Sequence, residues 1–128
     1  MDAVTPGLLR FARKLAELEI DLLALEFTEL RTLARQSAGK GPGPKSSLLK
    51  IRGTEIQQRA SELVLEAAGQ YAAPHLTGAT QPLQNALPVG PQHARGAADT
   101  YFNMRKASIY GGSNEIQRNI IAKAILGL

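Results

Sequence analysis

The sequence contains no cysteine in its 128 residues. A disulfide framework, a cysteine-ligated zinc site and a thiolate nucleophile are therefore excluded. A chain without cysteine is compatible with a reducing compartment, and we expect a cytoplasmic protein. The two histidines, His75 and His93, lie far apart in a segment rich in proline and glycine. No carboxylates are spaced around them as metal ligands usually are, so we predict no metal site.

Aromatic residues and long apolar runs are also scarce. Aromatics make up 5% of the chain and tryptophan is absent, so the core must consist mostly of Leu, Ile, Val and Ala. No stretch approaches the roughly 20 apolar residues of a membrane span. The start of the chain has Asp2 and no apolar segment after a basic one, unlike a signal peptide. The net charge is +4, but the basic residues are scattered, which predicts a solvated surface and no nucleic-acid binding.

Helix-forming residues, by contrast, are abundant. A hydrophobic content of 44% over this length fits one globular domain, 1–128, with a modest core. A helix is predicted over 6–37, because Thr5 can cap it and Pro6 suits its first position. Its apolar residues recur at the alternating spacing of a helix packed lengthwise against others: Leu8, Phe11, Leu15, Leu18, Leu22 and Leu25. A second apolar strip, formed by Leu9, Ile20, Leu23 and Phe27, indicates more than one neighbour.

The rest of the chain predicts further helices separated by breakers. Alternating glycine and proline over 39–44 ends the first helix, and Ser46 or Ser47 is a suitable N-cap for the next. Residues 71–94, rich in proline and glycine, are predicted to form a long loop. Helices are predicted over 46–69, 96–108 and 113–126. Without a convincing strand or a repeat, the predicted fold is all-α, an antiparallel up-and-down four-helix bundle.

The turn before the last predicted helix has the clearest local chemistry. Gly111 and Gly112 allow backbone angles that other residues avoid and let a ligand approach closely. Ser113 then starts a helix whose free N–H groups and dipole favour an anion or a carbonyl oxygen. An ordinary capped turn between two helices has the same local sequence. Both interpretations stay open on local physics alone.

A longer pattern surrounds this turn. The order Tyr-X-Gly-Thr/Ser-X-X-Ile-Gln-Arg-X-Ile-Ile-Ala at the end of a helical domain is typical of acyl-CoA dehydrogenases. The chain matches it at Tyr110, Gly112, Ser113, Ile116, Gln117, Arg118, Ile120, Ile121 and Ala122. The preceding segment 101–106 is similar to the arginine-containing helix that leads into the turn. The whole chain thus resembles the last part of the C-terminal helical domain of that family.

The resemblance implies FAD-dependent α,β-dehydrogenation of an acyl-CoA thioester in fatty acid metabolism. In the family a carboxylate removes the α-proton and the flavin takes the β-hydride, while hydrogen bonds to the thioester oxygen stabilise the developing charge. The resemblance assigns Ser113 and Glu115 to the cofactor, and Tyr110, Gly111 and Gly112 to the substrate. It also implies an electron-transfer acceptor as a partner, and a homo-oligomer.

The chain departs from the family at the catalytic base. Gly111 occupies the position of the usual glutamate and has no side chain, so the catalytic residue is unassigned. Glu115 matches a flavin-facing position rather than the base. Other family branches carry the base on an earlier helix, so we expect it before residue 1 or absent from the protein. The chain alone is expected to be an inactive part of a larger flavoenzyme.

Two cofactor motifs are also weak. The Arg-X-Gln-Phe-Gly segment that touches a neighbouring subunit's FAD does not occur, and the Gln-X-X-Gly-Gly-X-Gly-Tyr loop is reduced to 65–71. A different class of function fits the apolar strips of the first helix: a non-catalytic helical module for oligomerisation or interaction. Both hypotheses predict self-association, and they differ in whether a flavin is bound.

Overall fold

The computed structural model describes residues 6–41, 43–73 and 90–127, and these contain four α-helices and no strand. The α-helices are α1 (Pro6–Ser37), α2 (Lys45–Ala68), α3 (Ala97–Met104) and α4 (Asn114–Leu126). Three short 3₁₀ segments join them: η1 (Gly69–Ala72), η2 (Gln92–Ala94) and η3 (Arg105–Ser108). The prediction of an all-α, four-helix fold is confirmed. No helix in this part of the chain is long and apolar enough to cross a membrane.

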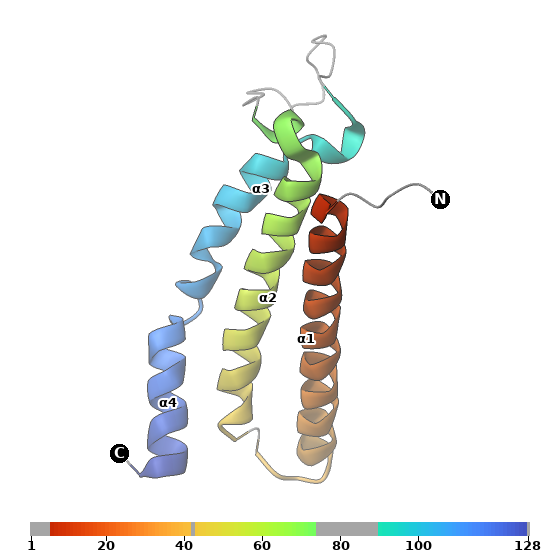
Figure 1. Ribbon diagram of the computed structural model, residues 1–128. Helices are drawn as coiled ribbons and strands as arrows, with labels where there is room; N and C mark the ends of the chain where they lie inside the picture. The colour runs from red at the N-terminus through yellow and green to blue at the C-terminus, as the bar shows by residue number, and fades with distance from the viewer. Residues whose placement is uncertain (1–5, 42, 74–89, 128) are drawn as a thin grey trace.

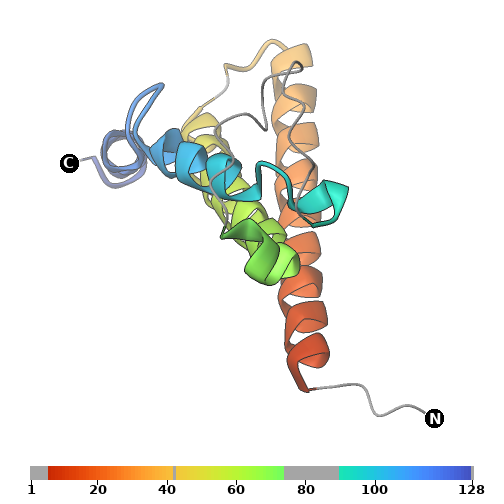
Figure 2. The same cartoon turned by 90° about the horizontal axis from the view of Figure 1, so that it is seen from above.

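The helix α2 lies in the middle of the molecule. The helix α1 runs antiparallel to it on one flank, while α3 and α4 follow one another on the other flank (Figure 1). The view from above shows the same order, with α2 between α1 and the α3–α4 pair (Figure 2). Because α2 has neighbours on both sides, it holds more of the buried residues than any other helix in the described part of the chain.

The contact between α1 and α2 uses only part of the predicted apolar seam. Leu18 is buried against Ile56 and Leu63, and Phe11 and Leu25 pack beside them. These α1 residues are seven positions apart, so they lie on one face of the helix. The other seam residues are exposed: Leu8, Leu15 and Leu22. The second strip is exposed as well: Leu9, Ile20, Leu23 and Phe27.

Small residues form a second cluster where α2 ends. Ala68 and Ala72 pack against Ala94 and Ala97, with Leu65 at the edge. Alanines let these backbones approach closely, and η1 and η2 lie side by side here. The described ends of the predicted loop 71–94 therefore contain 3₁₀ turns, whereas residues 74–89, including His75, lie outside the described part of the chain.

Some helix ends differ from the sequence pattern. Pro44, rather than Ser46 or Ser47, occupies the N-cap position of α2 and makes no side-chain cap. The Ser46 hydroxyl instead donates to the Gly43 carbonyl oxygen at 3.0 Å. The segment predicted as one helix over 96–108 is α-helical only to Met104 and continues as 3₁₀ helix to Ser108. The 3₁₀ segment leads directly into the glycine turn before α4.

Candidate functional site

The turn that joins η3 to α4, residues 109–113, holds most of the predicted site residues. Its entry is fixed by the Lys106 carbonyl oxygen, which accepts from the N–H groups of Ile109 at 2.9 Å and Tyr110 at 3.3 Å. The side chains of Ile109 and Tyr110 are 69% and 52% exposed. Tyr110 is therefore presented to the surroundings rather than to the core of the described residues.

The two glycines of the turn adopt backbone angles that side chains disfavour. Gly111 has φ +68° and Gly112 has φ +86°. A Cβ at Gly111 would have no heavy atom within 4 Å, whereas a Cβ at Gly112 would lie 2.8 Å from Gln117 Nε2. Because position 111 combines open space with a left-handed backbone, a ligand can approach the main chain there.

Ser113 is the N-cap of α4, as its place in the sequence predicts. Its hydroxyl accepts a hydrogen bond from the N–H of Ile116 at 3.4 Å, and its carbonyl accepts from the N–H of Gln117 at 3.0 Å. An N-cap satisfies one of the donors that a helix start leaves open. The remaining donors and the positive end of the helix dipole make this end of α4 suited to an anionic or carbonyl group.

Glu115 lies in the first turn of α4, and its side chain is exposed. Hydrogen bonds from its own backbone N–H and from the Ser113 side chain hold the pKa of Glu115 below its ordinary value. The positive charges of Arg118 and Lys50 act in the same direction. The carboxylate is therefore ionised near neutral pH and can accept hydrogen bonds, but its lowered pKa makes it a weak proton acceptor.

A buried polar cluster fastens α4 to α2 directly behind the turn. Asn114, the first residue of α4, is only 4% exposed. Its Oδ1 accepts from Lys50 Nζ at 2.8 Å, and its amide lies 3.2 Å from Thr54 Oγ1. Lys50 also donates to the Ser108 carbonyl oxygen at 3.3 Å. The position of the turn is thus determined by side chains of α2.

Arg105 forms a second anchor one helical segment earlier. Its guanidinium donates to the Gln58 carbonyl and to Ser61 Oγ, both at 2.9 Å, and forms an ion pair with Glu62 at 2.7 Å. It also lies 4.3 Å from the ring centroid of Tyr101. These contacts satisfy most of the donors of Arg105, so its role is to hold η3 on α2.

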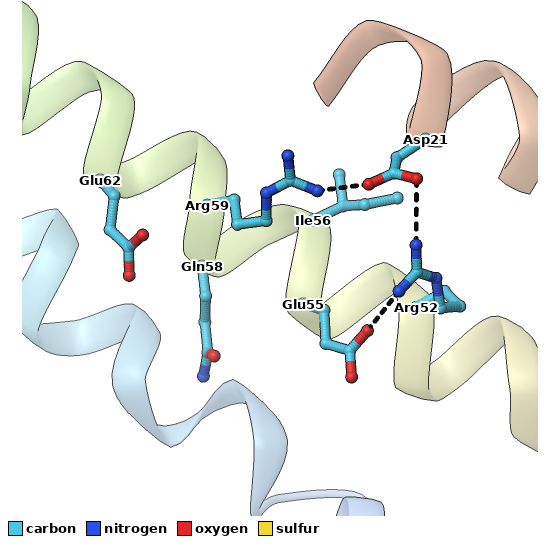
Figure 3. Close-up of a pocket in the computed structure, with 7 residues that line it drawn as sticks. All are labelled: Asp21, Arg52, Glu55, Ile56, Gln58, Arg59 and Glu62. Carbon is cyan, nitrogen blue, oxygen red and sulfur yellow. Dashed lines mark hydrogen bonds and ion pairs between the residues drawn. The ribbon is translucent and has the colours of Figure 1, made fainter. Parts of the chain in front are cut away.

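A cavity of about 230 Å³ lies between α1 and α2, away from the turn. Figure 3 shows that charged side chains line it and that Arg52 and Arg59 both reach Asp21. Arg52 also pairs with Glu55 at 2.9 Å. Each arginine is already paired with a carboxylate. We therefore interpret the side chains that line this cavity as a structural ion-pair network rather than a binding site. Among the described residues no group of three or more His, Asp or Glu side chains could hold a metal ion.

The sequence matches the acyl-CoA dehydrogenase C-terminal domain over residues 10–126. The chain belongs to this family. A stretch of 28 residues is 68% identical to the acyl-CoA dehydrogenase IpdE1 of Mycobacterium tuberculosis (strain ATCC 25618 / H37Rv). A stretch of the same length and identity matches IpdE1 of Mycolicibacterium smegmatis (strain ATCC 700084 / mc(2)155). Each match covers 22% of this chain and spans 7% of the length of the relative. No solved structure matches the chain.

The acyl-CoA dehydrogenase pattern and the structure select different residues around the turn. The pattern selects Tyr110 and Ser113, but it leaves position 114 open and includes nothing from α2. The structure adds Lys50, Thr54 and Asn114 as the groups that fix the turn. A sequence signal existed for two of them, because Lys50 and Thr54 are four residues apart and share one face of α2.

Proposed function

We propose that this chain is the C-terminal part of an FAD-dependent acyl-CoA dehydrogenase that introduces a double bond between the α and β carbons of an acyl-CoA thioester. The family match over residues 10–126 supports the proposal most directly. In it, Ser113 and Glu115 contact the cofactor, and Tyr110, Gly111 and Gly112 contact the substrate. The base is supplied by another segment, because Gly111 has no side chain.

The residues of the turn fit a flavin cofactor. FAD supplies the oxidising group that accepts the hydride from the substrate. The Ser113 hydroxyl and the first N–H groups of α4 offer hydrogen bonds to carbonyl or phosphate oxygens of a cofactor. The open space at Gly111 lets a planar group approach the main chain without meeting a side chain. Glu115 remains ionised and exposed, available to N–H or O–H donors of the cofactor.

The proposed chemistry divides the work between this chain and the segment that carries the base. Tyr110 and the glycines border the substrate and exclude water from one side of the reacting carbons. The positive end of α4 favours the negative charge that develops as the α-proton leaves. This arrangement stabilises the charged state of the substrate, while the proton itself goes to a carboxylate outside the turn.

The test uses the full-length protein in which this chain occurs, purified without added flavin. The expected result is a yellow protein whose flavin absorbance bleaches when a medium-chain acyl-CoA is added without oxygen. A matched substrate, the 2,2-dimethyl analogue, has no α-proton and should leave the flavin oxidised. Bleaching by both compounds would contradict α-proton abstraction, and a purified protein that neither contains nor binds FAD would overturn the proposal.

A second candidate, a helical oligomerisation module without catalysis, is favoured by one observation. The face of α1 turned away from α2 exposes large apolar side chains, with Ile20 and Phe27 66% and 65% exposed. Surfaces of this kind mark association sites. In the proposed enzyme the same face forms contacts between copies of the chain, and an electron-transfer acceptor is a further partner. Flavin content separates the two candidates.

A further inference from the structure

One lysine joins the two ends of the glycine turn. Lys50 Nζ donates to the carbonyl oxygen of Ser108, the last residue of η3, at 3.3 Å. The same ammonium donates to Oδ1 of Asn114, the first residue of α4, at 2.8 Å. The five residues between these two contacts are 109–113. The distance across the turn is therefore set from α2.

The orientation of the Asn114 amide follows from these contacts. Because its Oδ1 faces the Lys50 ammonium, its Nδ2 must be the group that donates to Thr54 Oγ1 at 3.2 Å. The Thr54 hydroxyl proton is then directed to the Ile51 carbonyl oxygen at 2.8 Å. The result is a chain of donors and acceptors from Lys50 to the backbone of α2, and it leaves Asn114 a single favourable orientation.

The charge of Lys50 is placed against the usual preference of a helix. A cation beside a helix N-terminus is unfavourable, because the helix dipole is positive there. Yet the hydrogen-bond acceptors of Lys50 within the described residues, the Ser108 carbonyl and the Asn114 amide oxygen, are neutral. The nearby Glu115 carboxylate feels the charge of Lys50, which helps to lower its pKa. A half-buried lysine in such a place is explained by a role at the turn: it supplies two directed hydrogen bonds and a positive charge to this end of α4.

We propose that Lys50 is a positioning residue for the cofactor-facing turn, fixing Gly111–Ser113 by bridging Ser108 and Asn114. The inference rests on the proposed function. It means that α2, through Lys50, affects how tightly the turn binds the cofactor. Thr54 supports it by orienting Asn114. Replacing the lysine should loosen the turn and remove a positive charge near the proposed flavin, so FAD affinity and flavin potential should both change.

The test compares variants of the flavin-loaded full-length protein. Lys50→Met nearly keeps the length of the side chain but removes both hydrogen bonds and the charge. The FAD dissociation constant should rise about tenfold or more, because hydrogen bonds from a charged donor are lost. The midpoint potential of the bound flavin should fall, because a positive charge favours the reduced, more negative flavin. Lys50→Arg should restore most of the affinity.

The matched control is Lys14→Met. Lys14 also connects two helices, through an ion pair with Glu66 at 2.7 Å, but it lies on α1. The Lys14→Met variant should have a lower melting temperature but an unchanged FAD affinity and an unchanged flavin potential. Equal losses of FAD affinity in both variants, or an unchanged dissociation constant in Lys50→Met, would overturn the inference.

Thr54→Val keeps the test decisive if Lys50→Met does not fold. This variant keeps the lysine and the shape of the side chain but removes the acceptor of Asn114, and it should weaken FAD binding several-fold. An unchanged FAD affinity in Thr54→Val would then overturn the inference. A wild-type protein that does not bind FAD would instead overturn the proposed function, so the two failures are distinguishable.

Discussion

Asp21 of α1 forms a direct ion pair with Arg59 of α2 in the middle of the contact between these helices (Figure 3). The same carboxylate accepts from Arg52 at 3.0 Å. The two arginines lie on one side of α2, and Ile56 between them is buried against α1. Asp21 thus adds a charged clamp beside the Leu18 cluster.

Removing this charge should loosen α1. We expect Asp21→Asn to lower the free energy of unfolding by about 1 kcal/mol, since partly exposed ion pairs contribute up to roughly that amount. Urea unfolding at low salt checks the value, and the loss should shrink in concentrated NaCl because salt screens the pair. The control Glu17→Gln breaks an ion pair within α1, with Arg13, and should cost less. Equal losses in both variants would contradict a role for Asp21 in helix packing.

Ser113 can be tested so that capping and cofactor contact are separated. Ser113→Ala should lower the free energy of unfolding by about 1 kcal/mol, whereas Ser113→Gly should lower it by only a few tenths, because glycine is tolerated at an N-cap. Both variants lack the hydroxyl. If the hydroxyl contacts FAD, both should lose flavin on dilution, measured by absorbance after gel filtration. Flavin loss in the alanine variant alone would show that the residue acts through the helix.

The glycine turn predicts a backbone effect rather than a steric one. Gly111→Ala and Gly112→Ala should each lower the free energy of unfolding by about 1–2 kcal/mol, because both positions have positive φ. The close contact at Gly112 is to the flexible end of Gln117, which can move aside. Adding Gln117→Ala to Gly112→Ala should therefore restore little stability in urea unfolding. A full rescue would show that the contact dominates.

The period of the apolar residues predicted α1 and α4 well, for a physical reason. The sequence of α1 has a proline at its start, a recurring apolar stripe and a glycine-proline stop, and the Phe11, Leu18 and Leu25 part of that stripe packs on α2. The tail pattern likewise identified the family, because its Ser113 caps the same helix, α4, that carries the Ile-Gln-Arg run. Where local signals and tertiary packing point to the same structure, the sequence is sufficient.

The bounds of α2 follow from the sequence to within one residue, but its buried residues were harder to predict, because packing on two sides buries polar side chains. Ser47, Thr54 and Ser61 are all buried, although hydropathy places such residues outside. Thr54 and Ser61 satisfy their hydroxyls by donating to the carbonyls of Ile51 and Gln58. The role of Lys50 depends on residues about sixty positions away in the chain, and no local pattern contains that information.

The lowered pKa of Glu115 predicts a pH-dependent contribution to stability. A carboxyl whose pKa is lower in the folded than in the unfolded protein stabilises the fold at any pH above its unfolded pKa, which is near 4.5. This contribution to the free energy of unfolding disappears as the pH falls through the folded pKa. The stability difference between the wild type and Glu115→Gln should therefore be constant from pH 7 to about pH 5.5 and shrink below pH 4.5. Urea unfolding at pH 7, 4.5 and 3 measures it. A difference that grows on acidification would contradict the assignment.

The exposed face of α1 predicts self-association. Ile20 and Phe27 are seven residues apart, so they lie on the same side of the helix, opposite the face that carries Leu18. We expect the double variant Ile20→Arg/Phe27→Arg to shift the protein toward monomer in sedimentation velocity at micromolar concentration, with an unchanged far-ultraviolet circular dichroism spectrum. Arginine should act by placing a charge that would have to be desolvated in an apolar interface. The control Glu19→Arg/Glu26→Arg adds the same number of arginines at positions that are already charged, and it should leave association intact. A wild-type protein that sediments as a monomer would count against this surface as an interface between copies, and against the oligomerisation module as an alternative function.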